Sequence, residues 1–443
     1  MIIKKLIALL LCVAAVFSLF ACTANEIPKE TGSIPEQTEK KDYSQYAGIV
    51  HDPKTWYEEF MALPIANDQM TQEELRQLCA DAFKANLTFH WTPNKEITYG
   101  YTLLKKKSEI SLKPGIAYSG LCYATGQSSG HLYKILQYYD LETGVLDVEA
   151  MDANKVMSIV TSACARGAEQ GWNRVSGTHG IGSMDSFNQY DANILPVGPY
   201  NYVQTDYNYD FGSRTATNQI IAKNGEETMY ESFALMKTAD GLYSSSAWHV
   251  MMCSSDAVVV RNSAGGINPV ESYVLVHEQD AEGTKTDKKD ITQENGVILR
   301  QLGTVDKKYT FKKLLQSGYI PFTLKEFVGQ EPVEPGDAWL GTKTGKLEKT
   351  GTLTIKELSQ KTLWGNYALL VLEFQVKNPE GQVLHSWDPE FVTLPTTYSA
   401  TLGGTLDASE LSAYADGKNT IHVNARLANG ELLEAYSGIL KID

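Results

Sequence analysis

The stretch TSACARGAEQGWNRV, from Thr161 to Val175, places a cysteine at the start of a helical pattern. Cys164 stands where the helix can begin, and Ala165 and Gly167 follow it with little side-chain bulk. Unpaired backbone N–H groups at a helix N-terminus stabilise a thiolate and can hold the oxyanion that develops in acyl transfer. The pattern therefore predicts a nucleophile at Cys164, with small residues leaving room for a substrate and Trp172 on the packed side of the helix.

A nucleophilic thiol also needs a base, because only its thiolate attacks and its ordinary pKa is about 8.5. His249 opens the apolar run in SAWHVMMC, where its ring can be held across a helix N-terminus. A third polar group must then fix the tautomer of the imidazole. The strand-like run VLVHEQD offers His277, Glu278 and Gln279 for this role, and the sequence leaves the choice among them open.

Helical patterns dominate the first part of the body of the chain, and strands follow. TQEELRQLCADAFKANL is amphipathic, with Thr71 as N-cap and Glu74 at the capping-box spacing. HLYKILQYYDLETGVLD and ANKVMSIVTSACARGAEQGWNRV predict further helices. The runs SAWHVMMCSS, AVVVRN and ESYVLVHEQ are short, apolar and β-branched, which predicts strands. This order predicts an α+β domain in which helices pack on an antiparallel sheet.

A second domain is predicted beyond VGQEPVEPGDAW, a stretch from Val328 to Trp339 that is rich in proline, glycine and acidic residues. The segments that follow alternate in strand fashion, and Asn429-Gly430 gives a hairpin signal. About a hundred residues of this kind predict an immunoglobulin-like β-sandwich. We therefore assign the α+β domain, with an N-terminal helical extension, to 46–328 and the β-sandwich to 333–443.

The N-terminus has the features of an export signal. Lys4 and Lys5 precede the apolar run LIALLLCVAAVFSLFA, which is typical of a secretory signal peptide. The end of this run, LFAC, is similar to the lipobox of bacterial lipoproteins, which implies a lipid on Cys22. We expect a signal peptide over 1–21 and a disordered tether over 22–45, where large apolar residues are scarce. The mature protein is thus predicted to be extracytoplasmic and lipid-anchored to the cell membrane.

Composition and motifs exclude several classes of function. The formal net charge of −14 argues against a nucleic-acid partner, since binding to the phosphate backbone requires a basic face. HExxH and CxxC patterns are both absent from the sequence, so we predict no metal and no cofactor. Apart from Cys12 and Cys22, four cysteines remain, which permits a disulfide-stapled scaffold as an alternative.

Several segments, taken in order over residues 115–280, resemble the NlpC-type cell-wall peptidases, a papain-like family. YSGLCYATGQ is similar to the tyrosine element of that family, ACARGAEQGW to its cysteine helix and WHVMMC to its histidine strand. VLVHEQ would supply the third polar residue. The matching positions are Gly120, Tyr123, Gly126, Cys164, Gly167, His249 and Val250.

The resemblance implies a papain-like fold and a metal-free cysteine hydrolase that cleaves peptide amide bonds. It implies that Cys164 is the nucleophile, that His249 is the base and that Tyr123 lies beside the thiol. Together with the predicted location, it implies a cell-wall peptide as substrate, and the C-terminal domain would position the enzyme on wall or glycan.

Two alternatives compete with this interpretation. Cys122, in SGLCYATGQSSGHLYKIL, also precedes a helical pattern and is a second candidate nucleophile. Ala163 stands where the family has an aspartate, and the spacings between the elements are long. These departures favour a non-catalytic surface lipoprotein that binds glycan, peptide or a partner protein through a degenerate papain-like fold.

Overall fold

The computed structural model shows a mixed α+β protein with several largely antiparallel sheets. The predicted signal peptide, Cys22 and most of the predicted tether lie outside the described residues. In the part of the chain that is described, no helix has the length and apolarity needed to cross a bilayer. The described residues are 41–103, 106–124, 132–162, 164–176, 200, 216–247, 249–279, 290–329, 333, 339–340, 344–347, 352–358, 360–361, 368–387, 390–394, 400–405, 411–426 and 432–441.

A five-stranded antiparallel sheet, called the central sheet here, lies between two layers of helices, in the order β13-β10-β9-β8-β14. Successive side chains of a strand point to opposite faces, so Val250 and Met252 share one face and Met251 and Cys253 the other. The strands are β8 (Gly241–Ser244), β9 (His249–Cys253), β10 (Tyr273–Glu278), β13 (Thr304–Thr310) and β14 (Ile320–Phe322).

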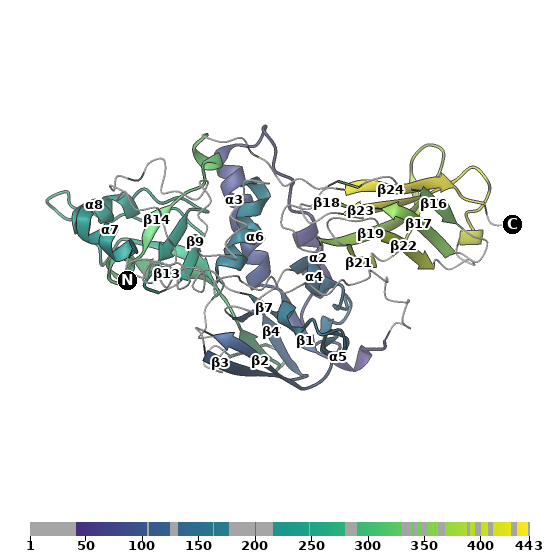
Figure 1. Ribbon diagram of the computed structural model, residues 1–443, viewed down its shortest axis with the longest axis horizontal. Coiled ribbons are helices and arrows are strands. Elements are labelled where there is room, and N and C mark those ends of the chain that lie inside the picture. Colours follow the sequence, from purple (N-terminus) through teal and green to yellow (C-terminus); the bar gives the residue numbers. More distant parts are fainter. Residues whose placement is uncertain are drawn as a thin grey trace, which may run out of the picture.

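Helices cover both faces of this central sheet, which is why its strands are apolar on both sides. Val250 and Met252 pack with α3 (Gln72–Leu87) and α6 (Cys164–Ser176) on one face. Met251 and Cys253 pack on the opposite face with α7 (Ala216–Asn224), α8 (Glu226–Phe233) and α10 (Phe311–Gln316). Figure 1 shows α3 and α6 side by side on one side of the sheet, with α7 and α8 on the other.

The sequence explains how α3 and α6 form and why they approach closely. Thr71 caps α3 in a complete capping box with Glu74, which confirms the predicted helix start. A Cβ on Gly171 of α6 would lie 2.4 Å from the Cys79 carbonyl oxygen, so this contact requires glycine. The expectation that Gly167 leaves room for a substrate is wrong, because the Phe83 ring fills the space beside it.

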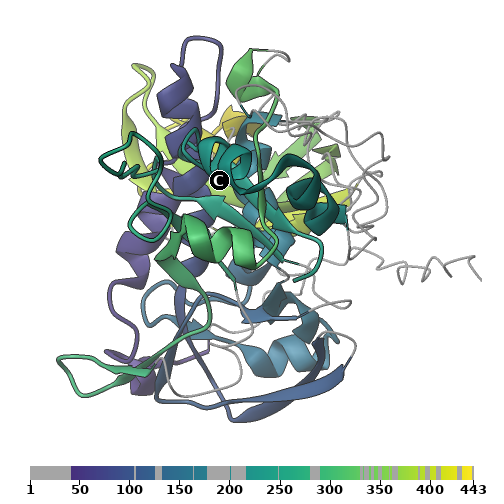
Figure 2. The same ribbon diagram turned by 90° about the vertical axis from the view of Figure 1, so that its left-hand side faces the viewer.

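A second five-stranded sheet, in the order β11-β12-β4-β1-β6, forms a separate layer with its own apolar core. A hairpin of β2 (Ile97–Leu103) and β3 (Lys106–Leu112) lies beside it in Figures 1 and 2. The strands of the sheet are β1 (His90–Pro93), β4 (Ile116–Ser119), β6 (Val145–Leu146), β11 (Asp290–Thr292) and β12 (Ile298–Gln301), and the nearby helices are α2 (Pro53–Met61), α4 (Leu132–Leu136) and α5 (Val148–Ala153).

The segment HLYKILQYYDLETGVLD is predicted to be helical, but the structure shows a short helix followed by a strand. Only α4 is helical, and a turn then leads into β6, which pairs in parallel with β1. The Asp140 carboxylate accepts hydrogen bonds from the backbone N–H groups of Glu142 and Thr143. Gly144 has a φ of 72°, which few other residues adopt. The Asp140 cap and Gly144 together shape the turn that leads into β6.

The C-terminal part consists mainly of strands, and Figure 1 shows it beyond α2 and α4, on the side away from the central sheet. β23 and β24 pair antiparallel as the hairpin signal predicts, although Asn429 and Gly430 themselves lie outside the described residues. The domain boundary near 328–339 falls largely on residues that are not described and stays a prediction. The strands are β15 (Trp339–Leu340), β16 (Thr344–Leu347), β17 (Thr352–Leu358), β18 (Gln360–Lys361), β19 (Ala368–Lys377), β20 (Val383–Ser386), β21 (Glu390–Leu394), β22 (Ala400–Thr405), β23 (Thr420–Arg426) and β24 (Leu432–Ile439).

Candidate functional site

The helix α6 begins at Cys164, where the sequence allows a helix to start, but the longer helix predicted over ANKVMSIVTSACARGAEQGWNRV is interrupted before this residue by a short strand. β7 (Thr161–Ser162) leads into it and pairs in parallel with β5 (Cys122–Tyr123). This register sets the buried residue Tyr123 opposite Ser162, so the tyrosine element runs alongside the segment that enters the helix. The side chain of Cys164 lies outside the described residues, and its role as nucleophile stays a prediction.

Cys122, the competing nucleophile, is a fully buried thiol. Burial raises its pKa to about 12, so the thiol is neutral near pH 7 and is not primed to attack. Cys79 and Cys253 are also buried, and burial raises the pKa of each. All three are free cysteines. The disulfide-stapled alternative therefore finds no disulfide among the cysteines whose side chains are described.

His249 is brought together with Glu278, one of its three possible orienting partners. His249 opens β9 and Glu278 ends β10, and His249 Nε2 lies 3.1 Å from Glu278 Oε2. The carboxylate is almost fully buried, whereas the imidazole keeps 13% of its side-chain surface exposed. Because the two residues lie on adjacent hydrogen-bonded strands, Glu278 can hold both the tautomer and the orientation of the imidazole.

Two residues of β13 complete the surroundings of the Glu278 carboxylate. Lys307 forms an ion pair with it, and the Tyr309 hydroxyl donates to Oε2 at 3.0 Å. Burial alone would raise the pKa of Glu278, but the hydrogen bond from His249 and the charges of His249 and Lys307 outweigh burial and lower it. Glu278 is therefore a carboxylate near neutral pH, as an orienting residue must be.

His277 points to the opposite face and does not join this cluster. Its ring lies edge-on to Phe83 of α3, with 6.1 Å between the ring centroids. Burial lowers the pKa of His277 to about 4, so the ring is neutral near pH 7. Its Nδ1 accepts a long hydrogen bond, 3.4 Å, from the backbone N–H of Asp306. The structure thus places Glu278, and not His277, at the imidazole of His249.

The central sheet separates His249 from α6. The imidazole shares a face with Met251 and contacts Tyr319, both on the side of α7, α8 and α10. α6 packs on the other face, against Val250 and Met252. The first turn of α6 and His249 nevertheless lie at the same end of the sheet, because Gly167 approaches the side chain at the end of β10, beyond Glu278.

That side chain belongs to Gln279, the third of the predicted orienting residues. Its Nε2 donates to the Leu121 carbonyl oxygen, and its Oε1 lies 3.3 Å from the position that a Cβ on Gly167 would occupy. Gln279 is almost fully buried. It therefore connects the end of β10, the tyrosine element and the first turn of α6, and it faces away from His249.

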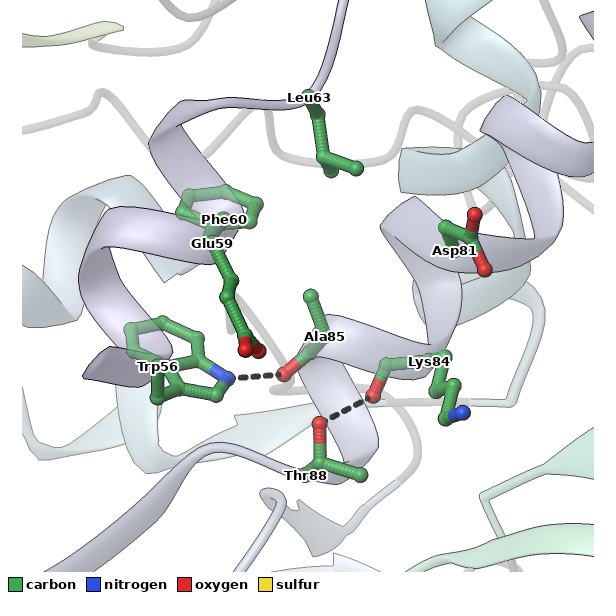
Figure 3. A pocket seen from close by; sticks show the side chains of 8 residues that line it. All are labelled: Trp56, Glu59, Phe60, Leu63, Asp81, Lys84, Ala85 and Thr88. Atoms are coloured by element: carbon green, nitrogen blue, oxygen red, sulfur yellow. Dashed lines mark hydrogen bonds between the residues drawn. The ribbon is translucent and has the colours of Figure 1, made fainter. Parts of the chain in front are cut away.

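Concave surfaces also occur away from this cluster. A pocket of about 250 Å³ lies between α2 and α3, on the outer side of α3. In Figure 3, Trp56 and Glu59 on α2 face Ala85 on α3, and Trp56 Nε1 donates to the Ala85 carbonyl oxygen. The pocket combines an aromatic wall with carboxylates and one lysine. Among the described residues, no group of three or more His, Cys, Asp or Glu side chains is arranged to hold a metal ion.

Comparisons with known proteins assign no family. No family profile and no curated protein sequence matches the chain. A structure of the ApaA protein from Bordetella pertussis covers 24% of this chain and 94% of its own, at 11% identity and a TM-score of 0.14. A DUF4785 family protein from Legionella pneumophila covers 46% of this chain and 47% of its own, at 14% identity and a TM-score of 0.17. Likenesses this weak support neither a fold family nor a function.

Proposed function

We propose that the protein is a lipid-anchored, extracytoplasmic cysteine hydrolase that cleaves peptide amide bonds, with cell-wall peptides as its substrate. The observation that carries the proposal is the His249–Glu278 pair, at the end of the central sheet where α6 begins at Cys164. A base held by a buried carboxylate and a cysteine at a helix N-terminus are the two parts that thiol-based acyl transfer requires. The proposal includes the papain-like, NlpC-type arrangement of the α+β body.

In the proposed reaction, Cys164 loses its proton to His249 and its sulfur attacks the carbonyl carbon of a peptide bond. The Glu278 carboxylate engages Nε2 and would hold the imidazole while the ring accepts the thiol proton. The backbone N–H groups in the first turn of α6 would hold the oxyanion. When the C–N bond breaks, the imidazolium returns the proton to the leaving amine. Water, deprotonated by His249, then hydrolyses the thioester and restores the thiol.

The mechanism places one geometric demand on the site. Because His249 and α6 lie on opposite faces, the imidazole must reach the sulfur around the end of the sheet rather than through it. The position of His249 at the start of β9 is the feature that would allow this approach.

Replacement of Cys164 by alanine tests the proposal directly. We expect the full-length protein to release free amino groups from muropeptides prepared from purified bacterial cell wall, and we expect the Cys164→Ala variant to release none above background. Cys122→Ala serves as the matched control and should keep activity, since its thiol is buried and neutral. Equal release by the wild type and Cys164→Ala would contradict the proposal.

A non-catalytic binding protein is the second candidate function, and it has a specific observation in its favour. The sheet separates His249 from α6, as expected for a degenerate site. The pocket beside Trp56 offers an aromatic and acidic surface for a ligand such as a glycan or peptide. In this case the strands of the C-terminal part, which we propose form an immunoglobulin-like sandwich, would help to hold the ligand. Retention of wall fragments without cleavage would favour this function.

A further inference from the structure

The two oxygens of the Glu278 carboxylate serve different partners. Oε1 forms the ion pair with Lys307, whereas Oε2 lies 3.1 Å from His249 Nε2 and 3.0 Å from the Tyr309 hydroxyl. The Glu278 side chain is only 1% exposed, so water scarcely reaches the group that these partners share. Charges on the partners are therefore weakly screened from one another.

The surroundings of Lys307 and Tyr309 fix the charge of each near neutral pH. Burial alone would lower the pKa of Lys307, but the charge of Glu278 and its hydrogen bond outweigh burial and raise it. Burial, together with the charge of Glu278, raises the pKa of Tyr309 to about 12. Near pH 7 Lys307 is therefore an ammonium and Tyr309 a neutral donor, so Lys307 balances the negative charge of Glu278 before His249 takes up any proton.

This balance changes how readily His249 is protonated. Beside an isolated buried carboxylate, an imidazole gains a proton easily, because the imidazolium and the carboxylate attract each other. Beside a carboxylate that already pairs with an ammonium, the same proton gives the cluster a net positive charge, and the ammonium repels it. The Lys307 charge therefore favours the neutral ring, which is the form that can accept a proton.

The other titratable groups near His249 lie at its edge, at a distance or in solvent. Tyr319 of β14 meets the ring edge-on, with 6.4 Å between the ring centroids. The buried residue Asp240 lies at the other end of β9, beside Cys253. On the helices that cover this face, the charged side chains all reach solvent, which screens them. They are Lys223 on α7, Glu226, Glu227 and Glu231 on α8, and Lys312 and Lys313 on α10.

The residues that flank Lys307 on β13 serve the opposite face of the central sheet. Asp306 Oδ1 lies 3.9 Å from His277 Nδ1, and Lys308 Nζ lies 3.8 Å from the centre of the Tyr273 ring. Lys308 carries the same charge as Lys307 on the same strand, but it lies over an aromatic ring instead of at the carboxylate. It is therefore a matched control for the charge of Lys307.

We propose that Lys307 is a positioning residue of the base, which by pairing with Glu278 keeps the His249 ring neutral near pH 7 and able to accept a proton. The inference rests on the proposed hydrolase function, in which His249 deprotonates first the Cys164 thiol and later water. Lys307 contacts neither the substrate nor the sulfur in this scheme. It acts on the reaction only through Glu278.

An NMR titration of the histidine rings tests this role without any substrate. Histidine-labelled full-length protein is titrated across the pH range in which histidine gains its proton, and the His249 signal is identified by its loss in His249→Gln. In the wild type the midpoint of the His249 titration should lie below pH 7. In Lys307→Met it should rise by about one pH unit, since removal of a nearby cation eases protonation of the ring. Lys307→Arg and Lys308→Met should both keep the wild-type midpoint.

Lys307→Gln gives a second way to remove the charge if Lys307→Met folds poorly, because it keeps a donor for Glu278. The role of Lys307 is overturned by a wild-type midpoint above pH 7, by an unchanged or lower midpoint in the folded uncharged variant, or by an equal rise in Lys308→Met. Each of these results leaves the hydrolase standing. If the midpoint rises as expected but the wild type and Cys164→Ala are equally inactive on muropeptides, the link from Lys307 to His249 holds and the hydrolase fails.

Discussion

The two faces of the central sheet place their histidines in opposite environments, one apolar and one charged. His277 points toward α3, where Phe83 and the surrounding apolar side chains keep the ring neutral. His249 lies one strand away on the other face, where it meets the charged carboxylate of Glu278. Since His277 and Glu278 are neighbours in sequence, a shift of one residue along the strand decides between an apolar and a charged environment. The comparison teaches that the face, not the residue type, indicates which histidine can act as a base.

Substituting each histidine in turn should show most clearly how the two faces differ in their effect on activity. His249→Ala removes the proposed base and should lower muropeptide hydrolysis by about a thousandfold. His277→Gln should keep most of the activity, because its side chain packs on α3 and away from the cluster. The rate of alkylation of Cys164 by iodoacetamide at pH 6 provides a readout that needs no substrate, and it should fall only in His249→Ala. Similar losses in both variants would remove the distinction between the faces.

The pH dependence of stability should reveal the neutral histidine. Burial lowers the pKa of His277 to about 4 in the folded protein, whereas in the unfolded chain the pKa is about 6.5. Between these values the unfolded chain binds the extra proton, so stability falls as the pH drops from about 6.5 toward 4. This residue should account for about 2 kcal/mol of lost stability between pH 7 and pH 5.

Urea unfolding of the wild type and of His277→Leu at both pH values checks this expectation. The variant lacks the buried imidazole, so its free energy of unfolding should change less between pH 7 and pH 5. A pH dependence that is identical in the two proteins would mean that another group governs it.

Glu278→Gln should have a smaller effect on stability. The substitution keeps the shape of the side chain but leaves Lys307 and His249 without their negative partner. Since Lys307 keeps 36% of its side-chain surface exposed and can regain water, we expect a loss of about 1–2 kcal/mol at pH 7. The effect should fade as the pH falls through the lowered pKa of Glu278, because the wild-type carboxylate is then protonated as well. Urea unfolding at pH 7 and pH 3.5 measures it.

Local signals in the sequence predicted the elements that depend on local interactions. Thr71 and Glu74 identified the start of α3 through their capping pattern. Cys164 was predicted as a possible helix start and α6 does begin there, but the longer helix predicted over ANKVMSIVTSACARGAEQGWNRV is interrupted by β7. The helix predicted before α5 was wrong in its second half, because β6 forms by pairing with the distant strand β1. Such a non-local pairing leaves no mark in the periodicity of a short run.

The candidate site was predictable in its residue types but not in its arrangement. The sequence named His249 and Glu278 together, yet it could not say which face of the sheet each occupies relative to α6. The sequence also held two signals, of which the first was misinterpreted and the second was overlooked. Gly167 and Gly171 lie four residues apart, a spacing that favours close helix packing rather than substrate access. Asn86 interrupts the apolar face of α3 as a buried amide, and the sequence analysis did not single it out.

Among the described residues, three buried thiols make the chain sensitive to oxidation once it unfolds. Cys79, Cys122 and Cys253 lie in three separate apolar cores, and burial disfavours the reactive thiolate in each. Opening any one core would expose a single sulfur to oxidants, whereas complete unfolding would release all three and allow them to cross-link wrongly. In oxidising surroundings, the rate of unfolding would therefore determine the lifetime of the unoxidised protein. A higher barrier to unfolding would lengthen that lifetime.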